Sequence, residues 1–201
     1  MDILNSRHLT SQDSYLQLFS SAGEYLYYLT ATPEGIKSAH ESAFHLTVKP
    51  GKTKQGSGTQ HDVKVNWDGN CYVPKPDRLE ISVNDYVVWH CERMAGSPPF
   101  AVRGQSEGDS FSSSSMSATS AYTHFFLTPG EVKYQVSGKG SYLVRVADHR
   151  KVKDYERRAA DAPVVTIRRG EASPRELDIV AGQTVIWAVE EGSEVSIASV
   201  R

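Results

Sequence analysis

The chain has 201 residues, of which 39% are hydrophobic, with 15 glycines, 9 prolines and a formal net charge of −2 at pH 7. This composition is ordinary for a globular protein and excludes a chain dominated by disorder. The near balance of 22 basic and 24 acidic residues gives no reason to expect a nucleic acid as partner. No hydrophobic run approaches the roughly 18 residues that span a bilayer, so we expect no membrane partner either.

In chain order, the first predicted elements come from a segment that returns later. Residues 15–29 align without a gap with residues 122–136, at an offset of 107 positions. Each copy has an aromatic stretch, a turn that closes on Gly-Glu and a run of alternating hydrophobic residues, which predicts two strands joined by a turn. A further alternating stretch, at 44–48 and at 142–146, predicts one more strand in each copy.

A second repeated pattern lies further along the chain. The stretch from Leu79 to Trp89 returns as Leu177 to Trp187, 98 positions later. Each copy alternates hydrophobic and polar residues, turns on a small polar pair and then runs into the tryptophan. This pattern predicts a half-buried strand, a tight turn and a second strand.

These repeats predict a division of the chain into units of about 100 residues with many short strands, which is typical of all-β sandwiches. Residues 61–149 read as a whole unit, residues 1–50 as a second half and residues 163–201 as a first half. A half sandwich would expose its hydrophobic face and its strand edges. We therefore expect residues 163–201 to pack with residues 1–50, within one chain or head to tail between chains. The alternative is that the chain is a fragment of a longer array.

Two connectors fit this division. Residues 51–60 contain no hydrophobic residue and predict a flexible linker. Residues 149–162 are strongly charged and rich in helix formers, so they are either a short exposed helix or a solvated connector.

Several motifs resemble the cupredoxin family. Residues 76–89 are similar to its Pro-x-x-Ile-x-Val-x-x-Gly-Asp-x-Val-x-Trp pattern, and residues 110–113 resemble its Phe-x-Ser loop. Residues 125–134 look like its Phe-x-x-Pro-Gly-x-x-x-Tyr stretch. Residues 163–197 repeat the first part of the pattern and residues 4–48 the second. The resemblance implies tandem Greek-key β-sandwiches.

The copper site of that family is not supported by the residues present. A type 1 copper site uses two imidazoles, one thiolate and a weak thioether. At the matching histidine positions this chain has Phe100 and Val195, and at the matching cysteine positions it has Val136 and Leu29. The loop that follows Val136 holds no ligand residue. The resemblance therefore implies units that have lost copper, and we expect no metal and no other cofactor.

Few other residues suggest chemistry. His90 and Cys91 adjoin, but successive strand residues point to opposite faces, so the pair reads as a surface histidine and a small buried cysteine. Cys71 and Cys91 could form a disulfide or remain free thiols. The chain lacks Gly-x-Ser-x-Gly, His-Glu-x-x-His and phosphate-loop motifs, so we expect no enzyme. Eight serines at 104–121 form either a phosphorylated loop or an ordinary exposed one.

The sequence thus favours a non-catalytic, copper-free module that binds or scaffolds other proteins or associates with itself. Loops at the sandwich ends are the expected partner surface. Its candidate residues are Pro98, Pro99, Phe100, Ser112, Ser113, Gly138 and Lys139. Two alternatives stay open: a copper or redox protein that uses His90, Cys91 or His124, and an array segment that builds a filament.

The sequence gives only weak evidence on the cellular compartment of the protein. Residues 1–5 lack the basic and hydrophobic regions of a signal peptide. The chain also has no Asn-x-Ser/Thr glycosylation acceptor. Both observations favour an intracellular location.

Overall fold

The fold is all-β, as the alternating patterns predict. The computed structural model describes residues 3–31, 43–51, 58–91 and 97–200. The first strands are β1 (Asp13–Leu18), β2 (Gly23–Ala31), β3 (Ala43–Lys49), β4 (Gln60–Trp67), β5 (Tyr72–Lys75), β6 (Arg78–Ser82), β7 (Tyr86–Cys91), β8 (Phe100–Ser106) and β9 (Asp109–Ser112). The later elements are β10 (Ser120–Phe125), β11 (Gly130–Val136), β12 (Lys139–Ala147), η1 (His149–Lys151), α1 (Tyr155–Ala160), β13 (Val164–Arg168), β14 (Glu171–Ser173), β15 (Glu176–Val180), β16 (Thr184–Glu191) and β17 (Ile197–Ser199).

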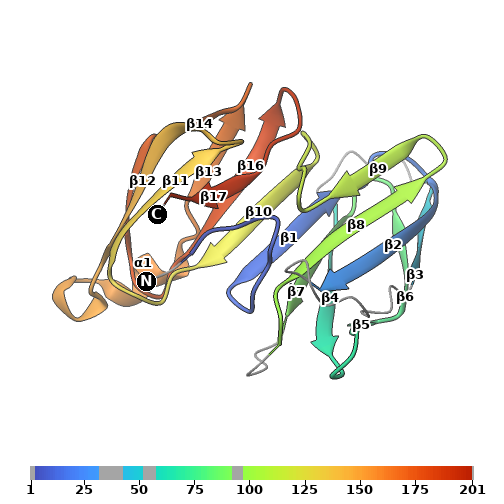
Figure 1. Ribbon diagram of the computed structural model, residues 1–201, viewed down its shortest axis with the longest axis horizontal. Coiled ribbons are helices and arrows are strands. Elements are labelled where there is room, and N and C mark those ends of the chain that lie inside the picture. Colours follow the sequence, from blue (N-terminus) through green and yellow to red (C-terminus); the bar gives the residue numbers. More distant parts are fainter. Residues whose placement is uncertain (1–2, 32–42, 52–57, 92–96, 201) are drawn as a thin grey trace.

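These strands form three sheets that make two sandwiches side by side (Figure 1). One eight-stranded sheet runs through both sandwiches, in the order β14-β13-β16-β10-β1-β7-β4-β5. The five-stranded sheet β6-β3-β2-β8-β9 packs against one half of it, and the four-stranded sheet β15-β12-β11-β17 packs against the other. We call β1 to β9 the first unit and β10 to β17 the second unit.

The two units share one strand order. The first has β5-β4-β7-β1 facing β6-β3-β2-β8, and the second has β14-β13-β16-β10 facing β15-β12-β11-β17. Of these strands, β1, β2, β3, β6 and β7 and their counterparts β10, β11, β12, β15 and β16 are the ones that the two sequence repeats predict. In each unit, the strands of the predicted second half, β1 to β3 or β10 to β12, therefore come first in the chain. The strands of the predicted first half follow them.

This grouping differs from the predicted packing of the halves. The strands of residues 1–50 pair with those of residues 60–112, as Leu46 opposite Leu79 and Leu29 opposite Val102 show. The strands of residues 120–147 pair with those of residues 164–199 instead. Residues 61–149 are thus divided between two sandwiches. Sequence repeats reveal which segments are equivalent, but they do not say which copy of one half packs with which copy of the other.

The N-terminal segment makes the predicted contact with the C-terminal half. The Leu4 amide donates to Ser199 Oγ at 2.7 Å, and the Ser6 amide donates to the Ile197 carbonyl at 3.0 Å. The segment thereby pairs with the edge of β17. In the first unit the same edge position, next to β8, is occupied by β9, whose Phe111 aligns with Leu4 at the offset of 107. The N-terminal segment thus completes the second unit.

The repeated strand-turn-strand is confirmed as β6–β7 and β15–β16. Both turns contain a residue with positive φ, Asn84 at 73° and Gly182 at 101°. The next residue caps each turn: Asp85 Oδ2 accepts from the Ser82 amide at 2.9 Å, and Gln183 Oε1 accepts from the Val180 amide at 2.8 Å. The same turn is therefore stabilised once by a carboxylate and once by a neutral amide.

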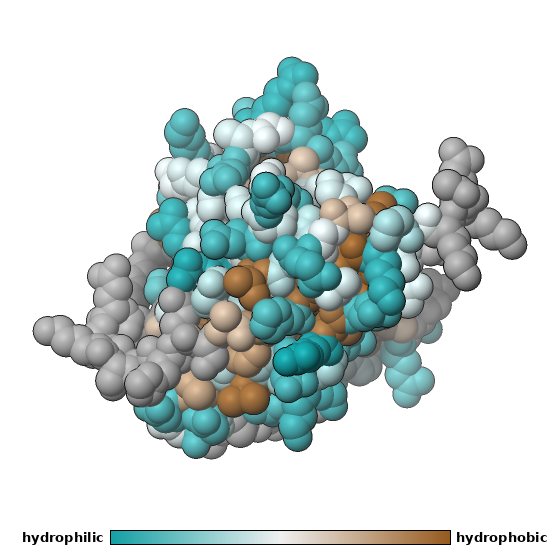
Figure 2. Space-filling view, turned by 90° about the vertical axis from the view of Figure 1, so that its right-hand side faces the viewer, coloured by the Kyte–Doolittle hydropathy of each residue, from teal (hydrophilic) through white to brown (hydrophobic). Residues whose placement is uncertain are grey.

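Of the two alternatives for residues 149–162, the structure has the short helices η1 and α1, which are largely exposed. Among the described residues, no helix is long and apolar enough to cross a membrane. Figure 2 shows the end of the first unit, where hydrophobic residues are exposed in small separate areas among hydrophilic ones.

We predict that the N-terminal segment stabilises the second unit. Leu4 is 1% exposed, so Leu4→Ala should lower the free energy of unfolding by about 2–4 kcal/mol. Ile3 is 63% exposed, and Ile3→Ala should change it by less than about 0.5 kcal/mol. Denaturant unfolding measures both values. Amide hydrogen exchange at residues 197–199 should be faster in Leu4→Ala but not in Ile3→Ala. Equal losses of unfolding free energy in the two variants would contradict this role of the N-terminal segment.

Candidate functional site

The two units meet where β1 pairs with β10. The strands are antiparallel, with Tyr15 opposite Tyr122, Asp13 opposite His124 and Gln17 opposite Ser120. Tyr15 and Tyr122 occupy the same position of the repeat. A local two-fold axis therefore passes through this pair of tyrosines and relates the two units.

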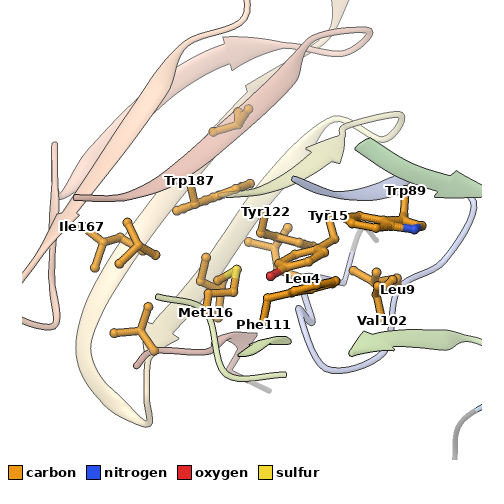
Figure 3. Close-up of a cluster of buried hydrophobic side chains, with 14 of the residues drawn as sticks. Leu4, Leu9, Tyr15, Trp89, Val102, Phe111, Met116, Tyr122, Ile167 and Trp187 are labelled. Atoms are coloured by element: carbon orange, nitrogen blue, oxygen red, sulfur yellow. The ribbon is translucent and has the colours of Figure 1, made fainter. Parts of the chain in front are cut away.

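The side chains around this axis belong to both cores. Figure 3 shows Tyr15 and Tyr122 between Trp89 of the first unit and Trp187 of the second. The ring centroids of Tyr15 and Trp89 are 5.8 Å apart, and those of Tyr122 and Trp187 are 5.5 Å apart. The buried hydrophobic residues of the two units form one continuous cluster. The junction is therefore part of the core.

On one side of the axis lies a buried acidic cluster. Asp13 is 2% exposed and accepts four hydrogen bonds. The Thr10 amide and Thr10 Oγ1 both donate to Oδ2 at 2.7 Å, and the Tyr122 hydroxyl donates to Oδ1. His124 Nδ1 lies 2.7 Å from Oδ1. A buried carboxylate needs such partners, so the cluster fixes β10 against β1.

On the other side lies a neutral cluster at the equivalent positions. Tyr15 donates its hydroxyl to Gln17 Oε1 at 2.8 Å, and Ser120 Oγ donates to the same oxygen at 2.8 Å. Gln17 Nε2 donates to Thr119 Oγ1 at 2.7 Å. Each cluster joins residues of β1 to residues of the second unit, so both sides of the axis are held by buried hydrogen bonds.

Burial also determines how these groups ionise. Burial raises the pKa of the Tyr122 phenol well above its usual range, and the neighbouring Asp13 carboxylate adds to the shift. Tyr122 therefore stays protonated and donates to Asp13. Burial likewise raises the pKa of Tyr15. His124 is 1% exposed, and its Nε2 atom is buried without a hydrogen-bond partner beside the ring of Phe126.

A groove of about 320 Å³ opens between the units on the surface. Its lining residues are Tyr28, Arg103, Gly104, Gln105, Ser110, Phe111, Ser112, Ser115, Ser117 and Glu194. The guanidinium of Arg103 lies over the ring of Tyr28, 4.7 Å from its centroid. Ser115, in the serine-rich segment, donates its hydroxyl to Glu194 of the second unit. The groove thus combines polar and apolar side chains, carries one basic and one acidic residue, and includes residues of both units.

The positions that match copper ligands are regrouped by the fold. The backbones of Phe100 and Leu9 bond to each other at 2.7 and 2.9 Å, and those of Val195 and Met116 do so at 2.9 and 2.8 Å. Phe100 and Val195 therefore hold equivalent places. Phe100 belongs to the same sandwich as Leu29, whereas the sequence analysis had grouped it with Val136 in one unit.

All four side chains at these positions are buried and apolar. Phe100 is 1% exposed, Leu29 3%, Val136 0% and Val195 3%. None of these side chains offers a nitrogen, sulfur or oxygen atom to a metal ion. In both units these four residues therefore serve as core packing.

The remaining candidate ligands do not converge. His90 and Cys91 lie on opposite faces of β7, with only Cys91 buried. Cys71 and Cys91 form no disulfide, so the bridge considered from the sequence is absent. Cys71 Sγ instead donates to Asp68 Oδ2 at 3.4 Å. Within the described part of the chain, no three histidine, cysteine, aspartate or glutamate residues are placed to hold a metal ion.

The predicted partner residues divide into buried and accessible ones. Phe100 and Ser113 are buried, at 1% and 0% exposure, and Ser113 Oγ accepts from the Val102 amide at 3.1 Å. These two therefore cannot contact a partner, which corrects the prediction for them. Pro98 and Pro99 are half-buried beside Cys91.

The accessible predicted residues lie at two places. Ser112 lines the groove between the units. Gly138 and Lys139 are exposed at the turn between β11 and β12. Sequence reasoning missed Tyr28, Arg103 and Glu194, which carry no motif. The pairing of β2, β8 and β9 brings Tyr28 and Arg103 next to Ser112, and the pairing of the two units adds Glu194. Residues 92–96 of the loop before Pro98 lie outside the described residues.

Comparison with known proteins adds no relative. No family model, no curated protein and no solved structure matches this chain.

The two tyrosines at the axis allow a matched prediction. Tyr122→Phe removes a donor to a buried carboxylate and should lower the free energy of unfolding by about 1.5–3 kcal/mol. Tyr15→Phe removes a bond between neutral groups and should cost about 0.5–1.5 kcal/mol. Denaturant titration at pH 7 measures both. A larger loss in Tyr15→Phe than in Tyr122→Phe would contradict the assigned role of Asp13.

Proposed function

We propose that this protein is a non-catalytic module of two cupredoxin-like units that do not bind copper, and that it binds or scaffolds other proteins. The observation that carries the proposal is the set of four buried apolar side chains, Leu29, Phe100, Val136 and Val195, at the positions where the family has ligands. The shared strand order of the two units supports the family assignment, because both units combine the same motifs in the same way.

The groove between the units is the proposed partner surface. It combines the stacked Arg103 and Tyr28 with serine hydroxyls and a carboxylate, and its volume of about 320 Å³ can hold side chains of a protein segment. Arginine and tyrosine are enriched at protein interfaces, where they combine apolar contact with hydrogen bonding. The rigid core beneath the groove holds these groups in place, which lowers the entropy that binding costs.

Photocross-linking tests this function. The exposed Gln105 in the groove is replaced by p-benzoylphenylalanine, and the exposed Lys133 on β11 serves as the matched control position. The proposal expects a discrete cross-linked protein in cells from position 105 and not from position 133. Adding Arg103→Glu to the first variant should remove that product. Products of the same kind at both positions, or none at 105, would contradict the groove as partner surface.

Copper loading tests the copper-free half of the proposal. After incubation with Cu(II) and dialysis, the protein should retain no stoichiometric copper and show neither visible absorption nor a paramagnetic signal. One retained copper ion per chain that is lost in His90→Ala, Cys91→Ala or His124→Gln would instead favour a redox protein with an unusual site.

A further inference from the structure

The two tyrosines at the local two-fold axis have matched surroundings. Tyr15 and Tyr122 are both 0% exposed, and each ring lies beside the tryptophan of its own unit, at centroid distances of 5.8 and 5.5 Å (Figure 3). The repeat therefore gives the two phenols the same burial and the same aromatic neighbour. A difference in their chemistry must come from the groups that bond to their hydroxyls.

The hydroxyl of Tyr122 faces a base, whereas the hydroxyl of Tyr15 does not. Tyr122 donates to Asp13 Oδ1, which is a carboxylate oxygen. Tyr15 donates to Gln17 Oε1, a neutral amide oxygen, at 2.8 Å. A carboxylate takes up a proton, whereas the side-chain amide of glutamine does not titrate in water. Only Tyr122 can therefore pass its hydroxyl proton to its hydrogen-bond partner.

This difference decides which phenol can lose an electron. A phenol that loses one electron becomes a strong acid, so a buried tyrosine is oxidised readily only where a base takes the hydroxyl proton at the same time. The Asp13 carboxylate is held in place for this transfer: Thr10 donates twice to Oδ2, and His124 Nδ1 lies 2.7 Å from Oδ1. Since an ionised carboxylate only accepts, His124 is the donor in this bond. The bonds fix Oδ1 toward the phenol of Tyr122.

A line of oxidisable rings connects Tyr122 with the surface of the second unit. Beyond Trp187 lies Tyr134, at a centroid distance of 5.6 Å, and beyond Tyr134 lies Tyr142, at 5.2 Å. The ring of Tyr142 lies beneath Gly140 at the exposed start of β12, where an added Cβ would come within 2.7 Å of it. An oxidant at this turn can therefore withdraw an electron from the buried phenol through rings in contact.

The first unit lacks such a line. Phe44 holds the position equivalent to Tyr142, 98 residues earlier, and its ring packs on Tyr27 at a centroid distance of 5.4 Å. A phenylalanine ring is much harder to oxidise than a phenol or an indole. The Nε1 atoms of Trp89 and Trp187 are both buried without a hydrogen-bond partner. An oxidised indole at either place has no acceptor for its proton, and only Trp187 lies beside a phenol that has one.

We propose that Tyr122 is a one-electron redox site, which reduces radicals or other strong one-electron oxidants at the surface of the second unit. One electron passes from Tyr122 through Trp187 and the tyrosines beyond it to the oxidant. The O–H bond of Tyr122 breaks, and its proton forms a new O–H bond with Asp13 Oδ1. The products are the reduced oxidant, a neutral tyrosyl radical and protonated Asp13. This property uses none of the groove residues of the proposed function.

Photo-oxidation followed by electron paramagnetic resonance tests the proposal. The full chain is oxidised with photogenerated tris(bipyridine)ruthenium(III) and frozen. In one sample meta-fluorotyrosine replaces Tyr122, and in the matched control it replaces Tyr15, so that both phenols are kept. Coupling to fluorine should split the tyrosyl signal in the Tyr122 sample and leave it unchanged in the Tyr15 sample. No tyrosyl signal, an unsplit signal in the Tyr122 sample, or splitting in the Tyr15 sample overturns the proposal.

Two further measurements test the proton acceptor. Asp13→Asn keeps an oxygen beside the phenol but removes the base, so the split signal should be lost in a chain that circular dichroism shows to be folded. In the chain without substitutions, the radical should form more slowly in heavy water, because the proton moves with the electron. A split signal that persists in Asp13→Asn, or equal rates in the two solvents, overturns the role of Asp13.

One substitution tests the route. Tyr142→Phe lies outside the polar cluster, so it should slow the formation of the radical without removing the radical. An unchanged rate in this variant overturns the route through Tyr142. None of these outcomes depends on cross-linking at the groove.

Discussion

The buried carboxylate of Asp13 is the constraint on which the arrangement of the two units depends. A carboxylate at 2% exposure is costly unless donors surround it, and two of its donors, Tyr122 and His124, belong to β10 of the other unit. Sliding β10 along β1 by one residue would turn Tyr122 and His124 to the solvent face and leave the carboxylate without them. The polar cluster therefore selects one register, and the continuous core then joins the two units.

A second constraint acts at the edge of the second unit. The β17 edge would expose unpaired backbone groups, but the N-terminal segment pairs with it, and the Asn5 amide also donates to the Tyr122 hydroxyl at 3.3 Å. The same tyrosine thus links the segment, β10 and Asp13. The first and last parts of the described chain are in this way held together through the junction, and the groove is built across that junction.

Much of the fold could be predicted from the sequence, because strand alternation and the repeats are local signals. The turns at Asn84 and Gly182 and the strands that contain Trp89 and Trp187 follow from such signals. The packing of the halves could not be predicted, because equivalent segments carry equivalent patterns and either pairing buries them. The groove was missed for a related reason: Arg103 and Glu194 carry no motif and meet only through the β1–β10 register. That Phe100, Val136, Val195 and Leu29 are apolar could be read from the sequence, whereas which of them share a sandwich required the topology.

Native-state hydrogen exchange in increasing denaturant tests most directly whether the junction makes the two units one cooperative structure. The account predicts that the slowest amides of β7 and of β16 report the same free energy of opening, within about 0.5 kcal/mol, because their strands share one core. It also predicts that substitution of Asp13 by alanine lowers both values together. Opening of β16 at a clearly lower free energy than β7, or a loss confined to one unit in that variant, would contradict the central role of the junction.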